Sequence, residues 1–135
     1  MREIKFRGKA VTGVWVYGGI SIKSHGTFIN DENLPYDDCC AVIPETVGEF
    51  TGILDSAGQE IYEGDIMRIE ELQFDTSGPL PDILIVKFFD GMFQLFRGSH
   101  PLMGLHLGYV KKGKVIGNMS DNPDLLERRN EHAII

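Results

Sequence analysis

The chain has few cysteines, and the two that it has are neighbours, Cys39 and Cys40. Adjacent cysteines do not form an ordinary disulfide, and no other cysteine is present to pair with them, so the fold cannot depend on disulfide bonds. On a strand, adjacent side chains point to opposite faces, which argues against both thiols binding one metal ion. We expect one thiol to be buried, the other to be half-exposed and neither to be functional.

The chain also lacks a long apolar run. No segment approaches the roughly 20 consecutive apolar residues that a membrane-spanning helix needs. Residues 1–7 carry charges where a signal peptide would need an apolar region. We therefore expect a cytoplasmic protein without a membrane segment.

The chain also has fewer positively charged than negatively charged residues. The formal net charge is −7 and the isoelectric point is near 5.0, which opposes the neutralisation of nucleic-acid phosphates. Local basic patches remain at two places, one at Lys5 and Arg7 and the other at Lys111, Lys112 and Lys114. Nucleic-acid binding is therefore kept only as an alternative.

Short apolar segments separated by turn residues fill most of the 135 residues, and this pattern predicts a mainly β protein. Strands are expected at 4–7, 14–22, 28–29, 40–43, 65–72, 83–89, 92–96, 108–110 and 115–117. Segment 14–22 is apolar on both faces, so we expect it to be covered on both. Loops are expected at 73–82 and 98–107, a turn at 111–114, and a short helix at 123–131, where Asn122 and Pro123 suit a helix start.

Four residues are expected to shape turns. Asp90 and Gly91 suit a two-residue type I′ hairpin that pairs Phe88 with Phe93 on a core face. Gly64 should adopt a backbone conformation that is costly for other residues. Asp65 should accept hydrogen bonds from nearby backbone N–H groups and so hold its hairpin in place.

Several segments together resemble the YopX family of phage and prophage proteins. They are Lys-Phe-Arg at 5–7, Trp-Val-Tyr-Gly at 15–18, Val-Ile-Pro-Glu-Thr-Val-Gly at 42–48, the turn-rich motif at 50–66, and Ile-Gly-Asn at 116–118 followed by Asp-Asn-Pro at 121–123. In similar sequences the position of Phe50 is usually Tyr, and the loops at 73–82 and 98–107 do not align. The order and spacing of the segments extend over nearly the whole chain.

The resemblance implies one domain with an SH3-like β roll or barrel at 49–120. Additional N-terminal strands at 1–48 would precede the barrel, and a short C-terminal helix and tail at 121–135 would follow it. The resemblance also implies a phage or prophage origin, and it carries over no catalytic residue.

The candidate catalytic groups can also be explained by roles in the fold. Glu60, Glu63 and Asp65 cluster as the carboxylates of a hydrolase would, but turn positions explain them as well. The four histidines lack a metal-ligand spacing, and Ser56 and Ser99 lack a neighbouring base; the histidines are His25, His100, His106 and His132. We therefore predict no catalytic residue, metal site or cofactor.

The aromatic residues Trp15, Tyr17, Tyr62 and Tyr109 could line a groove for an extended peptide, although a place in the core would explain them equally. The leading functional hypothesis is a noncatalytic protein-binding or assembly module that acts on a host or phage protein and forms a homo-oligomer. The alternatives are a small hydrolase that uses Glu63 and Asp65, and a nucleic-acid-associated protein.

Overall fold

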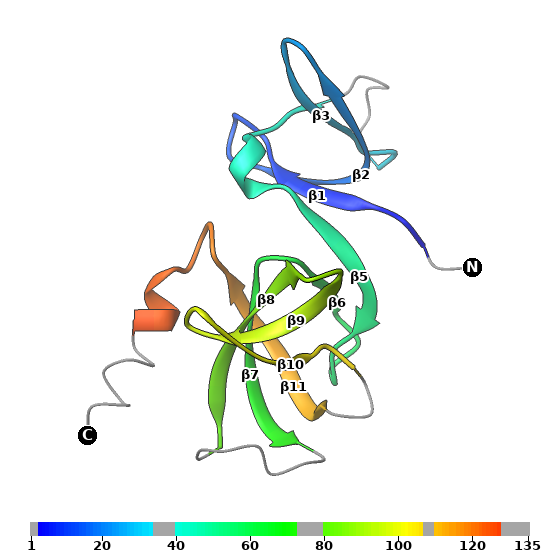
Figure 1. Cartoon of the computed structure of the whole chain (residues 1–135). Coiled ribbons are helices and arrows are strands. Elements are labelled where there is room, and N and C mark those ends of the chain that lie inside the picture. The colour runs from blue at the N-terminus through cyan, green and yellow to red at the C-terminus, as the bar shows by residue number, and fades with distance from the viewer. Residues whose placement is uncertain (1–2, 34–39, 73–79, 107–109, 128–135) are drawn as a thin grey trace. The chain divides into compact units, whose positions relative to one another are not determined.

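The computed structural model describes residues 3–33, 40–72, 80–106 and 110–127 (Figure 1). In these residues the chain is mainly β and its strands pair antiparallel, as the alternation of apolar and turn residues predicts. The chain divides into two compact units, residues 1–52 and 53–135, whereas the sequence placed the boundary between residues 48 and 49. Among the described helices, none is long and apolar enough to cross a membrane.

The first unit holds four strands, a 3₁₀ turn and the start of a fifth strand. These are β1 (Phe6–Lys9), β2 (Trp15–Lys23), β3 (Gly26–Asn30), β4 (Cys40–Ala41), η1 (Pro44–Thr46) and β5 (Gly48–Leu54), and the strands lie in the order β4-β3-β2-β1-β5. Val16, Ile29 and Val42 form the core of the unit. Cys40 is half-buried against this core, and Cys39 lies outside the described residues.

The expectation that segment 14–22 is covered on both faces is wrong. Val16 is 1% exposed on one face, whereas Tyr17 on the opposite face is 39% exposed. On the face of Val16 the cover also ends early, because Val14 is 58% and Ile22 is 78% exposed. Val14 precedes β2, and Ile22 pairs with Thr27 close to the hairpin turn, so neither residue reaches the small core. A sheet of such short strands covers only the middle of its apolar segment.

The second unit begins with the end of β5 and continues with six strands. These are β6 (Glu60–Tyr62), β7 (Asp65–Leu72), β8 (Asp82–Phe89), β9 (Met92–Arg97), β10 (His100–Gly104) and β11 (Val110–Asn118). A five-stranded sheet has the order β10-β9-β8-β7-β11, and β6 neighbours β5. Neither sheet of the described residues closes on itself, so the antiparallel fold is established and the closed barrel that the resemblance implied is not.

Two local expectations for this unit are wrong. The segment expected as a loop at 98–107 contains β10, which tolerates Pro101 because an edge strand can do without one ladder N–H group. The segment expected as a turn at 111–114 lies inside β11, because the long strand β7 offers partners from Leu72 to Asp65. Local turn composition is overridden here by pairing with a distant strand.

Buried side chains lie on both faces of the sheet formed by β7, β8 and β9. One face holds the main core, which consists of Met67, Ile69, Leu84, Val86 and Leu95 together with Ile61 of β6. The pairs Ile66–Ile85 and Ile85–Phe96 place three further buried residues on the opposite face. At the hairpin tip, Phe88 is 53% exposed. The core face therefore ends before the tip, although Phe88 was expected to belong to it.

The β8–β9 hairpin has a two-residue loop, since Phe89 pairs with Met92. Asp90 has φ of 53° and Gly91 has φ of 81°, the backbone conformation of a type I′ turn. The expected pairing of Phe88 with Phe93 is present, and their rings meet edge to face at 5.2 Å.

Gly64 joins three parts of the second unit. Its N–H donates to the Val86 carbonyl at 2.8 Å, and its own carbonyl accepts from the Met119 N–H at 2.9 Å. Its φ is 92°, in the left-handed region that favours glycine. Next to it, Asp65 Oδ2 accepts from the Tyr62 N–H at 2.8 Å. The β6–β7 turn is thereby tied to β8 and to the segment that follows β11.

The chain turns after β11 through a pair of asparagines. Asn122 Oδ1 accepts from the Asn118 N–H at 3.2 Å, and Asn118 Oδ1 accepts from the Asp121 N–H at 2.9 Å. A helical turn follows at 124–127. The rest of the helix expected at 123–131 lies outside the described residues.

We predict that Gly64→Val lowers the free energy of unfolding by about 1–3 kcal/mol, because a β-branched residue is strained at positive φ. Urea denaturation followed by circular dichroism measures the change. Gly19→Val is the control, since Gly19 has open space beside it and no positive φ. An unchanged midpoint and m-value for the Gly64 variant would contradict the role of this turn.

Candidate functional site

The second unit contains a pocket of about 280 Å³. Four parts of the unit supply its walls: the end of β5 with the turn that follows, the strands β6 and β7, the chain after β10, and the start of β11. The pocket therefore lies beside β11, an edge strand of the five-stranded sheet, and beside the chain just after β10. Its described lining residues are Ile53, Leu54, Asp55, Ser56, Ile61, Met67, Leu105, His106, Val110, Lys111 and Gly113.

The floor of the pocket is apolar. Ile61 and Met67 are buried members of the main core, and Ile53, Leu105 and Val110 pack against that core while remaining half-buried. A pocket of this kind exposes core side chains to whatever enters it. Such a floor favours an apolar group, because the group is removed from water there.

Gly113 keeps the β11 wall of the pocket close to the core. A Cβ atom at this position would lie 2.8 Å from Val110 Cγ1 and 2.9 Å from Ile69 Cδ1, both closer than packed atoms allow. The glycine in the Lys-rich segment thus permits close packing of β11 over the core and does not form a turn.

Asp55 and Ser56 attach the β5–β6 turn to β11. Asp55 Oδ1 accepts from the Ala57 and Gln59 N–H groups at 2.8 and 2.9 Å, and Oδ2 accepts from the Val115 N–H at 2.9 Å. The N–H of Ser56 donates to the Gly113 carbonyl at 3.0 Å, and its hydroxyl donates to the same oxygen at 2.9 Å. The turn therefore satisfies backbone groups on the edge of β11.

This arrangement defines what the polar rim can do. The Asp55 carboxylate accepts three backbone N–H groups, and the Ser56 hydroxyl is engaged with a backbone carbonyl, so both side chains serve the wall of the pocket. The His106 side chain lines the same pocket.

Lys111 brings positive charge to the same rim. Its side chain is exposed, and no ion pair is found for it in the described part of the chain. The neighbouring Lys112 lies 3.9 Å from Glu71, and Lys114 stands opposite Arg68 on β7. Arg68 in turn lies 3.3 Å from Glu70, so positive and negative side chains are mixed along these strands, and Lys111 contributes a positive charge at the pocket itself.

The predicted aromatic residues lie in different environments. Trp15 and Tyr17 are on β2, where the Arg7 guanidinium stands 5.0 Å from the centre of the Trp15 ring and Tyr17 is 39% exposed. Tyr62 is 2% exposed and donates its hydroxyl to Glu60 Oε1 at 3.1 Å. Tyr109 lies outside the described residues.

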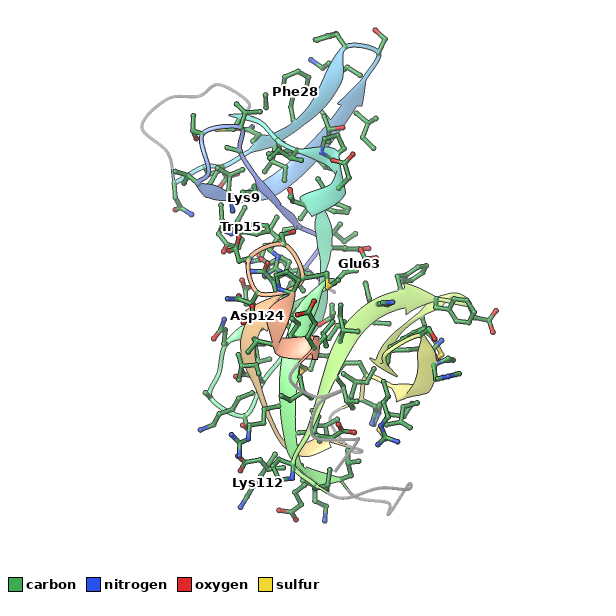
Figure 2. All side chains as sticks on the ribbon, turned by 90° about the vertical axis from the view of Figure 1, so that its left-hand side faces the viewer. Lys9, Trp15, Phe28, Glu63, Lys112 and Asp124 are labelled. Atoms are coloured by element: carbon green, nitrogen blue, oxygen red, sulfur yellow. The ribbon has the colours of Figure 1, made fainter. Side chains whose placement is uncertain are left out.

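The carboxylates of the β6–β7 turn lie away from the pocket. Asp65 is 1% exposed and Glu60 accepts the Tyr62 hydroxyl, while Glu63 is half-buried at the turn. Figure 2 shows Glu63 and Lys112 at opposite ends of the second unit. The carboxylate cluster and the basic rim are therefore separate features.

The histidines are spread over the chain. His100 begins β10 and His106 lines the pocket, His25 is in the first unit, and His132 lies outside the described residues. Within the described ranges, no group of three or more His, Cys, Asp or Glu side chains is placed to hold a metal ion.

Sequence reasoning missed the pocket. Its lining comes from residues 53–56, 61, 67, 105–106 and 110–113, and no local pattern joins these segments. One signal was available: the Asp-first, Gly-fourth turn at 55–58 is present, with the Gly58 N–H donating to the Asp55 carbonyl at 3.0 Å. A turn with both an Asp and a Ser side chain has spare acceptors and donors that can attach it to a neighbouring strand.

The family model of the YopX protein matches residues 7–127. The chain belongs to the YopX family. The matched region begins in β1 and ends in the helical turn after β11, so it includes both units and every residue of the pocket lining. The segments on which the resemblance was based are thus explained by common descent, and the YopX assignment from sequence is confirmed.

Among solved structures, the crystal structure of protein EF1440 from Enterococcus faecalis is similar to this YopX-family protein. The two chains are 18% identical, the TM-score is 0.58, and the likeness covers 93% of this chain and 99% of the other. At this identity the likeness establishes the fold alone. No match is found among the curated proteins.

We predict that Asp55→Ala lowers the free energy of unfolding by about 2–3 kcal/mol, because three N–H groups lose a charged acceptor. Ser56→Ala is the matched control in the same turn, and it should cost only about 0.5–1.5 kcal/mol because the Ser56 N–H still reaches Gly113. Chemical denaturation of both variants gives the comparison. Equal effects would show that the Asp55 hydrogen bonds do not hold the turn.

Proposed function

We propose that this YopX-family protein is a noncatalytic protein-binding module of phage or prophage origin that works in the bacterial cytoplasm. Its binding site is the pocket of the second unit, which takes an apolar side chain from a host or phage protein. The observation that carries this proposal is the apolar floor, formed by core residues such as Ile61 and Met67, inside a rim whose Asp55 and Ser56 are engaged by the backbone.

The geometry gives little support to the alternative of a hydrolase. Asp65 is almost fully buried, and one of its oxygens accepts the Tyr62 N–H, so it acts as a turn residue. Catalytic carboxylates need contact with substrate, and the pocket is lined by neither Glu63 nor Asp65. A binding role requires only the shape and the apolar floor that the unit has.

The proposal includes an SH3-like arrangement of the second unit. In this interpretation the β5–β6 turn, attached through Asp55 and Ser56, closes the edge of β11 where a further strand pair would close a complete barrel. The binding site then lies where the closure is incomplete, beside Leu105 and Val110.

A selection from a random-peptide display library tests the binding site. We predict that selected peptides bind the Leu54→Ser variant about tenfold more weakly, because an apolar contact at the rim is lost. Leu80→Ser is the matched control: Leu54 is 47% and Leu80 is 42% exposed, but Leu80 does not line the pocket. Its affinity for the peptides should be unchanged.

Two results would overturn the pocket as the binding site. One is a selection that enriches no peptide. The other is a set of peptides that bind the Leu54 variant normally and lose affinity for Phe88→Ser, which would place the site at the hairpin tip.

Self-association is a second part of the proposal, and the β8–β9 hairpin tip is the surface that favours it. Phe88 and Phe89 are each 53% exposed and Met92 is 48% exposed, so three large apolar side chains surround one tight turn. A second copy of the chain would bury them.

We predict that the wild-type chain sediments as more than a monomer at concentrations on the order of tens of micromolar, because association depends on concentration. The double variant with Phe88→Ser and Phe89→Ser should sediment as a monomer. Ile22→Ser, which removes an exposed apolar side chain in the first unit, is the control. A wild-type monomer throughout this range would contradict the proposal.

A further inference from the structure

We infer that the pocket recognises a peptide segment in which an acidic residue lies next to, or two positions from, the apolar side chain that enters the pocket, and that Lys111 binds this acidic residue. The inference rests on the proposed function, because it specifies the ligand of the same site.

The position of Lys111 on β11 is the first reason. Lys111 lines the pocket, whereas Lys112 and Lys114 do not; the register of β11 against β7 shifts on both sides of Lys112, so simple alternation along the strand does not decide this. Lys112 has Glu71 as a neighbour, but Lys111 has no ion pair in the described residues. Lys111 is therefore the lysine on the pocket rim.

The state of Asp55 is the second reason. Asp55 is the acidic residue among the described lining residues, and its two oxygens already accept three backbone N–H groups. Those donors stabilise the carboxylate in the wall of the pocket, although its negative charge remains. Because Asp55 forms no ion pair with Lys111 in the described residues, a negative group on a ligand would not have to displace it.

The size of the pocket suits a single side chain of a ligand. Its volume of about 280 Å³ is at the lower limit of the range of about 300–1,000 Å³ that is typical of small-molecule sites. One large apolar side chain fits, with its backbone outside. Residues two apart on an extended chain are separated by about 7 Å, which places a neighbouring acidic side chain over the rim.

Nucleic acid fits the same rim less well. Single strands bind through aromatic side chains on which bases stack, and the described lining contains no Phe, Tyr or Trp. The net charge of −7 also repels a polyanion, while a single carboxylate needs only a local positive charge.

The test uses the peptides selected above, in three steps. The first step is to sequence the peptides whose binding is weakened by Leu54→Ser. Asp or Glu should be enriched within two positions of their apolar anchor residue. The second is Lys111→Glu, which should weaken binding about tenfold, whereas Lys114→Glu, a reversal of charge on the same strand away from the pocket, should change it less than about twofold.

The third step is a double-mutant cycle. Replacing the acidic residue of the peptide by its amide should weaken binding to the wild type about two- to fivefold, as expected for an exposed ion pair. The same replacement should have no effect on binding to Lys111→Gln. Since Lys111 is exposed, neither Lys111→Glu nor Lys111→Gln should affect folding, and circular dichroism checks this.

The outcomes separate this inference from the proposed function. The role of Lys111 would be overturned if peptides weakened by Leu54→Ser carry no acidic residue, or if Lys111→Glu and Lys114→Glu lower their affinity equally. The pocket would then remain as a peptide site. No binding at Leu54 would overturn both. Binding of a 20-nucleotide single-stranded DNA that depends on Lys111, with no peptide binding, would overturn the choice of a protein ligand.

Discussion

The hydrogen bonds of Asp55 and Ser56 to β11 are the interaction on which the second unit depends. They cross a long stretch of sequence, from the β5–β6 turn to Gly113 and Val115. Without them the edge of β11 would present unpaired backbone groups, which are costly when buried and promote aggregation when exposed. With them the edge of β11 is covered by a turn, and the pocket with its apolar floor lies beside this turn.

The opposite end of the unit depends on Gly64. Its backbone bonds to Val86 and Met119 connect the β6–β7 turn, the central strand β8 and the segment after β11, and the Asp65 carboxylate holds the turn from inside. The turn-rich motif at 50–66 thus supplies both attachments of the unit, Asp55 at one end and Gly64 at the other. The hydrogen bonds of Asp55 and Asp65 give these two carboxylates roles in the fold.

Charge in this YopX-family protein is unevenly distributed. The chain is acidic as a whole, but lysines gather on β11 beside the pocket. These lysines lie in different environments. Lys111 lines the pocket, Lys112 is beside Glu71, and Lys114 is opposite Arg68. We propose a protein segment as the partner, since one exposed lysine at the pocket of an acidic protein suits a single acidic group better than a polyanion.

The sequence by itself determined the β class, the YopX family, the strand at 65–72, the two-residue hairpin at Asp90 and Gly91, and the turn roles of Gly64 and Asp65. These features depend on local backbone chemistry and on the order of short segments. Only the tertiary structure decided that residues 111–114 continue a strand, that 98–107 contains one, that β2 is covered on one face, and that a pocket lies beside β11. The reason is physical: pairing with a distant strand outweighs local turn propensity, and a cavity lined by segments from residue 53 to residue 113 leaves no periodic signal along the chain.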